Sequence, residues 1–123
     1  LAATSEGVFW TGPDGDSWTL GSGSEGYAAA LALDADDVLF AVVRARGGSA
    51  LVRSGTGGRS WEDVDQASEL PDPDFGVHAL LADPVVPGLL FYGAGDGVWA
   101  VDESGARPLR LGLPPVRRLF LLF

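Results

Sequence analysis

The stretch "GSGSEG", at residues 21–26, is a place in this sequence where residue type and spacing suggest chemistry. It fits the G-x-G-x-x-G pattern that binds the pyrophosphate of a dinucleotide at the start of a helix. Such a site needs a complete helix after the glycines and an acid at the end of the next strand. The apolar run "YAAALAL" soon reaches "DADD", and the strand "VLFAVV" ends at Arg44 and Arg46, which would suit only a 2′-phosphate. We therefore favour a flexible link between two groups of strands and expect no cofactor.

Acidic residues dominate the charge of the chain, with 17 Asp and Glu against 8 Lys and Arg and a formal net charge of −9. The stretches "DADD" and "DGD" gather the oxygen ligands that calcium prefers, but neither offers the spaced ligand series of a calcium-binding loop. We expect solvated acidic turns and no metal site. A surface this negative repels phosphate backbones, so we expect no nucleic-acid partner.

Catalysis by a histidine or by paired carboxylates finds little support in the sequence. His78 is the only histidine and lies in an apolar run, where the sequence places no orienting acid or nucleophile beside it. Glycoside hydrolysis needs two opposed carboxylates, whereas most acids here fall in expected turns, as Asp34 and Asp83 do. The chain has no cysteine, which excludes disulfides and thiolate metal sites. We expect His78 to be a half-buried strand residue and predict no catalytic residue.

An internal repeat shows which elements must position these residues. "GVFWTGPDGDSW" (7–18) aligns with "ALVRSGTGGRSW" (50–61), and each position shifts by 43, as from Trp18 to Trp61. A third copy, "GVWAVDESGARPL", has lost the tryptophan but keeps Ser104 and Gly105 at the turn. Each copy runs from apolar residues through a Gly/Asp/Ser cluster to an apolar restart, which predicts strand, tight turn, strand.

Further pairs of apolar runs precede the second and third copies, and both pairs break at an Asp-led loop (34–37 and 83–88). One unit then holds four short strands in roughly forty-five residues, the length of a propeller blade. We predict an all-β fold, a partial β-propeller of about three four-stranded antiparallel blades with almost no helix. The approximate blades are 1–26, 27–70 and 71–113, with the start of another at 114–123. The predicted strands are 28–33, 38–43, 49–54 and 61–64, then 77–82, 89–93, 97–101 and 107–111.

The pattern Ser/Thr-x-Asp-x-Gly-x-Thr-Trp is the Asp-box, and the chain resembles the Asp-box (BNR-repeat) β-propeller superfamily over nearly its whole length. This superfamily includes sialidases, xyloglucanases, sortilin-like receptors and photosystem II stability/assembly factors. The resemblance implies that the boxes are structural turns, with each tryptophan filling an equivalent space between sheets. Both boxes are degenerate here, since Pro13 and Thr56 stand at the aspartate position and Asp14 comes one place late. The residues concerned are Thr11, Asp14, Gly15, Ser17 and Trp18 in one copy, and Ser54, Thr56, Gly58, Ser60 and Trp61 in the other.

The fold alone does not determine function, because one propeller fold hosts many activities. We expect a non-enzymatic segment that acts as a rigid protein- or ligand-binding scaffold. The alternative is a fragment of an Asp-box glycoside hydrolase, sialidase- or xyloglucanase-like. The loop "ELPDPDFG" is a candidate partner-binding loop through Asp72, Asp74 and Phe75. We expect an extracytoplasmic (periplasmic or secreted) protein with no membrane span.

Three blades are too few for a propeller ring, which needs about four to eight. The first residues, "LAAT", resemble the second strand of a blade, and the last, "VRRLFLLF", resemble the first strand of another. The chain also begins without methionine, as a processed, trimmed or partial protein would. We therefore expect further blades, in the same polypeptide or in further copies, to complete the assembly.

Overall fold

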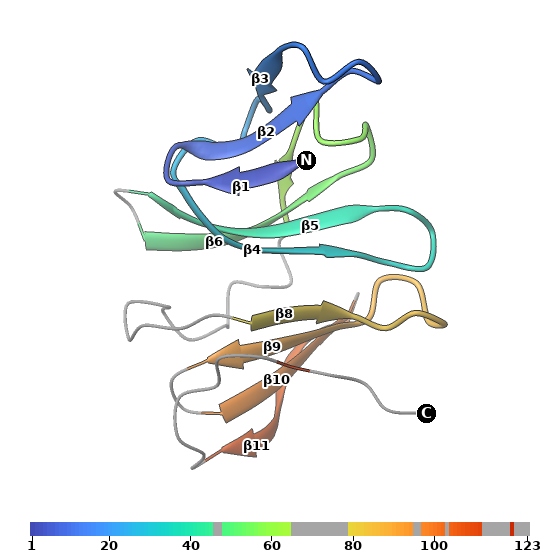
Figure 1. Cartoon of the computed structure of the whole chain (residues 1–123). Coiled ribbons are helices and arrows are strands. Elements are labelled where there is room, and N and C mark those ends of the chain that lie inside the picture. Colours follow the sequence, from blue (N-terminus) through green and yellow to red (C-terminus); the bar gives the residue numbers. More distant parts are fainter. Residues whose placement is uncertain (46–47, 65–78, 95–96, 103, 112–118, 120–123) are drawn as a thin grey trace.

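The computed structural model describes residues 1–45, 48–64, 79–94, 97–102, 104–111 and 119, and in these ranges it contains strands and turns without a helix (Figure 1). The strands form three antiparallel sheets that lie one above another (Figure 1). The predicted all-β class and its blade-like sheets are therefore confirmed.

The first sheet has three strands in the order β1-β2-β3. They are β1 (Ala2–Thr4), β2 (Gly7–Thr11) and β3 (Trp18–Leu20). β1 lies at the edge of this sheet and pairs antiparallel with β2.

The second and third sheets have four strands each, in chain order across the sheet. The second contains β4 (Tyr27–Leu33), β5 (Leu39–Ala45), β6 (Gly48–Ser54) and β7 (Glu62–Asp63). The third contains β8 (Ala79–Ala82), β9 (Leu90–Ala94), β10 (Gly97–Asp102) and β11 (Gly105–Leu111). Within the described residues, each of the eight predicted strands overlaps one of these strands.

One difference from the predicted strands is at Trp61, which lies before β7 and outside it. The backbone amide of Trp61 donates a hydrogen bond at 2.7 Å to the carbonyl of Ser22, between the first and second sheets. Since that amide bonds to Ser22, it is not available to the ladder with β6. Sheet pairing therefore begins one residue later than predicted.

The middle sheet is buried on both faces because its side chains alternate between two apolar clusters. On β5, Phe40 and Val42 join one cluster, while Ala41 and Val43 join the other. The first cluster also takes Leu90, Tyr92 and Val101 from the third sheet, and the second takes Val8 from the first sheet. The period of two on a central strand thus stacks all three sheets into one body.

An aspartate begins the turn between the first two strands in both four-stranded sheets. The Oδ1 atom of Asp34 accepts from the amides of Asp36 and Val38, at 2.9 and 3.0 Å. The Oδ1 atom of Asp83 accepts from Val85 and Val86, at 2.8 and 2.9 Å. A short carboxylate bonding to amides just ahead of it is the usual chemistry of an Asx turn, so both Asp-led loops are turns, as predicted.

Candidate functional site

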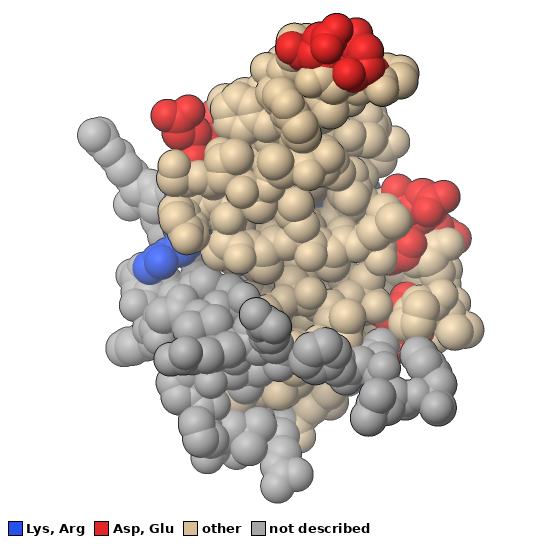
Figure 2. Space-filling model, viewed as in Figure 1, with Lys and Arg blue, Asp and Glu red and all other residues tan. Residues whose placement is uncertain are grey.

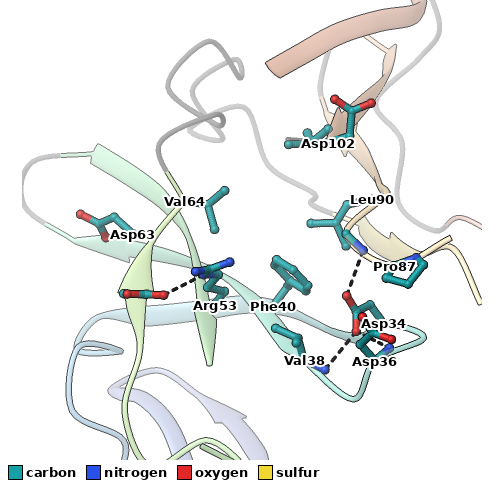
Figure 3. A pocket seen from close by; sticks show the side chains of 13 residues that line it. Asp34, Asp36, Val38, Phe40, Arg53, Asp63, Val64, Pro87, Leu90 and Asp102 are labelled. Carbon is teal, nitrogen blue, oxygen red and sulfur yellow. Dashed lines mark hydrogen bonds and ion pairs between the residues drawn. The ribbon is translucent and has the colours of Figure 1, made fainter. Parts of the chain in front are cut away.

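A cleft of about 390 Å³ lies between the second and third sheets, at the ends where their Asp-led turns meet (Figure 3). Its volume is in the range of small ligand sites, roughly 300–1,000 Å³. Apolar side chains of the shared core, including Phe40 and Leu90, contribute to the lining. The lining residues are Asp34, Asp36, Val38, Phe40, Arg53, Glu62, Asp63, Val64, Pro87, Gly88, Leu90, Val101 and Asp102.

The cleft carries far more negative than positive charge. Its lining residues include four aspartates and one glutamate but a single arginine, Arg53. The Nε atom of Arg53 pairs with Oε1 of Glu62 at 2.8 Å, and both side chains are more than half exposed. Such an exposed pair stabilises the fold by at most about 1 kcal/mol, but it neutralises the one cation among the described lining residues. The side chains of Asp36 and Asp63 are exposed and leave the cleft strongly negative.

Asp34 joins the two walls of the cleft. While Oδ1 accepts from its own turn, Oδ2 accepts a hydrogen bond at 3.0 Å from the amide of Gly88 in the β8–β9 turn (Figure 3). Asp34 is only 7% exposed, so the expected solvated turn is wrong at this position, although Asp36 and Asp37 are exposed as expected. Burial is tolerated because three amide donors replace the water around the carboxylate. The two turns are therefore held in one geometry.

Two other carboxylates are held in the ionised form. The hydroxyl of Ser104, then the side chain of Arg107 at 2.8 Å and the amide of Ser104, lower the pKa of Asp102 to about 2. The amides of Val86 and Val85 lower the pKa of Asp83. A general acid must hold a proton near neutral pH, which requires a raised pKa. Asp83 and Asp102 are therefore unsuited to that step.

No three His, Cys, Asp or Glu side chains are placed to hold a metal ion in the part of the chain that the structure describes. Figure 2 shows the acidic side chains in separate clusters toward the edges of the viewed face, with most of the area between them uncharged. Charge on this view thus gathers locally, with uncharged surface between the clusters.

The second repeat copy is a braced turn, even though threonine replaces the aspartate. The buried hydroxyl of Ser54 accepts from the amide of Gly58 at 3.0 Å, and the hydroxyl of Thr56 accepts from the amide of Ser60, also at 3.0 Å. Gly58 has φ +92°, a value that side chains rarely allow. The indole Nε1 of Trp61 donates to the carbonyl of Gly58 at 3.0 Å, and the ring is only 8% exposed. Hydroxyl groups thus serve as the amide acceptors of this turn.

The first copy is built more loosely. The hydroxyl of Thr11 donates to the carbonyl of Ser17 at 2.7 Å, and Gly15 has φ +70°. Oδ1 of Asp14 reaches the amide of Asp16 only at 3.4 Å. Trp18 is 50% exposed, so the expectation that both tryptophans fill equivalent buried spaces is wrong for Trp18. Trp18 pairs with Thr11, which lies three residues from Val8 on β2 and therefore on the face of the first sheet opposite to the cluster shared with the second sheet.

The stretch "GSGSEG" is a packed strap between sheets and not a dinucleotide loop. The residues after it form β4, where a dinucleotide site would require a helix. The amide of Ser22 donates to the carbonyl of Arg59 at 3.0 Å, and the fully buried hydroxyl of Ser24 bonds to Gly21 and Val8. A Cβ atom on Gly21 or Gly23 would clash with the backbone of Gly58 or Trp61. The stretch links two groups of strands as expected, but its hydrogen bonds to both sheets replace the expected flexibility.

The remaining candidates, His78, Asp72, Asp74 and Phe75, lie outside the described residues. Sequence reasoning missed the cross-sheet role of Asp34 and Gly88, since their bond spans 54 positions. The available signal was an aspartate at the start of both loops, which identified the turns but not the contact between them.

The residues described by the structure include no helix long and apolar enough to cross a membrane. Comparisons with protein-family models, curated proteins and solved structures gave no match to this chain. The fold and the cleft are therefore the basis for assigning a function.

Proposed function

We propose that this chain is a non-enzymatic segment of an Asp-box-type β-propeller, a rigid scaffold that binds a partner through the acidic cleft between its second and third sheets. The proposal rests on one observation: the cleft is negatively charged, and its two walls are held in a fixed geometry. The walls are joined by the Asp34–Gly88 bond and by a shared apolar core. A preformed cleft loses little freedom when a partner enters, which favours binding.

Charge complementarity favours a basic partner. The exposed carboxylates of Asp36 and Asp63 line the cleft, and Arg53, the one cation among its described lining residues, is paired with Glu62. A Lys or Arg side chain from a protein segment supplies the opposite charge, and its aliphatic stem suits the apolar lining that includes Phe40.

The hydrogen bonds and the ionised state of the cleft carboxylates support the scaffold over the glycoside-hydrolase alternative. Both oxygens of Asp34 accept backbone amides, and the lowered pKa of Asp102 keeps that group ionised. A glycosidase needs one carboxyl that donates a proton and an opposed carboxylate. Turnover of a sialoside or a xyloglucan oligosaccharide by the purified chain would favour the alternative.

Binding of an oligo-arginine peptide, measured by titration calorimetry, tests this proposal. We expect binding that weakens as salt rises, and a loss of about tenfold in affinity in the double variant Asp36→Asn, Asp63→Asn. The matched control is Asp16→Asn with Glu25→Gln, two exposed acids outside the cleft lining that carry the same total charge. Equal losses of affinity in the two double variants would show that the peptide is attracted by net charge only. That result would refute the cleft as the binding site.

A further inference from the structure

The outer face of the first sheet exposes residues whose repeat equivalents are buried in the second sheet. Trp18 aligns with Trp61 and is 50% exposed, against 8% for Trp61. Phe9 aligns with Val52 and is half-buried, whereas Val52 is 2% exposed. A hollow of about 340 Å³, lined by Phe9, Trp18 and residues of β1 and its turn, lies on this face.

The equivalent face of the second sheet is covered by the first sheet. Val52 and Trp61 pack in one apolar cluster with Val8 of β2. The backbones of Ser22 and Ser60 also pair across the same boundary. The structure therefore shows what covers a face of this type: the opposite face of another sheet of the same repeat.

The outer face of the third sheet corresponds, in the repeat, to a face that is packed against a neighbouring sheet elsewhere in the chain. Strand alternation turns Leu90 and Tyr92 toward the second sheet, so Phe91 between them points outward. Phe91 corresponds to Phe40 in the shared pattern "LF", and Val98 corresponds to Leu51 in the repeat. Phe40 and Leu51 are 6% and 5% exposed against the next sheet, whereas Phe91 and Val98 are only half-buried.

We propose that the two ends of the stack are complementary halves of one interface, so that copies of this chain associate head to tail. The Phe9–Trp18 face of one copy packs on the Phe91–Val98 face of a second copy, continuing the boundary found between the first and second sheets. Such a contact is heterologous, since different surfaces meet. The inference deepens the proposed scaffold and rests on its stacked sheets, but it does not involve the acidic cleft.

Self-association is tested by sedimentation of the purified chain over a range of concentrations, without peptide and at moderate salt, which screens the net negative charge. We expect concentration-dependent association that Trp18→Glu weakens by about tenfold or more, as removal of a central interface tryptophan does. Val85→Glu is the matched control, because Val85 is 72% exposed in the β8–β9 turn, on neither face. Association should persist in the Asp36→Asn, Asp63→Asn variant, which separates this inference from the cleft. A monomer at all concentrations would overturn the proposal.

A disulfide trap keeps the test decisive if Trp18→Glu disturbs the fold. The chain has no cysteine of its own, so only the introduced thiols can form a disulfide. A mixture of Trp18→Cys and Val98→Cys chains should form cross-linked pairs that contain one chain of each kind. Preferential pairing of Trp18→Cys with itself would indicate a face-to-face contact and would overturn the head-to-tail arrangement.

Discussion

The carboxylate of Asp34 accepts a hydrogen bond at 3.0 Å from the backbone amide of Gly88, which joins the β4–β5 turn to the β8–β9 turn. This contact links two sheets that also pack through a shared apolar core, and it lies in the lining of the acidic cleft.

Replacing Asp34 with alanine should lower the free energy of unfolding by about 2–3 kcal/mol. The substitution leaves the amides of Asp36, Val38 and Gly88 without their acceptor, and buried unpaired donors are costly. Urea denaturation measures the change. Asp36→Ala, an exposed neighbour in the same turn, should stay within about 0.5 kcal/mol. An equal loss in both variants would contradict the stabilising role of the Asp34 carboxylate.

The two repeat tryptophans should differ in their contribution to stability. Trp61→Ala should destabilise by about 3–5 kcal/mol, because a buried ring and its bond to Gly58 are removed. Trp18→Ala should cost less than about 1 kcal/mol at dilute concentration, since half of that side chain already contacts water. Thermal unfolding of dilute samples compares them. Similar losses at both positions would contradict the asymmetry of the two copies.

Gly23 should tolerate no side chain. It has φ +89°, and a Cβ there would overlap the carbonyl of Trp61. Gly23→Ala should therefore destabilise by about 1–3 kcal/mol through strain and displacement of the strap. Gly55→Ala is the control, because a Cβ at Gly55 meets nothing within 4 Å. Its free energy of unfolding should change by no more than about 0.5 kcal/mol, and a neutral Gly23→Ala would disprove the close packing of the strap.

Protonation of Asp102 should lower the stability of the fold as the pH falls. Its pKa in the folded chain is about 2, below the ordinary 3.8, so its contribution is complete above about pH 4. That contribution is lost as pH falls from about 4 to 2, because the unfolded chain takes up the proton first. A carboxyl titration followed by NMR should give the low pKa, and Arg107→Gln should raise it. An ordinary pKa in the unaltered chain would contradict the hydrogen bonds that Ser104 and Arg107 donate to Asp102.

The sequence predicted the strands well because their burial is periodic. Residues 40–43 alternate between two apolar clusters, which is the pattern of a strand buried on both faces. The repeat also located the turns, since Gly15 and Gly58 both adopt positive φ. These features depend on near neighbours in the chain.

Contacts between distant residues could not be predicted in the same way. The exposure of Trp18 depends on whether a sheet lies beside it. The repeat copy that contains Trp18 aligns with the copy that contains the buried Trp61, so the sequence alone does not distinguish them. The strap at residues 21–26 has the letters of a phosphate-binding loop, but the pairing of Ser22 with Ser60 gives it a different structure. The cleft likewise arises from turns that only the folded chain brings together.

The most direct test of the proposed binding scaffold is a backbone-amide NMR titration of the ¹⁵N-labelled chain with an oligo-arginine peptide. We expect saturable shifts confined to the cleft, at Asp36, Val38, Asp63 and Gly88, with the β2–β3 turn around Asp14 unchanged. Shifts that are equally large at both places, or no shifts at all, would contradict a specific acidic cleft.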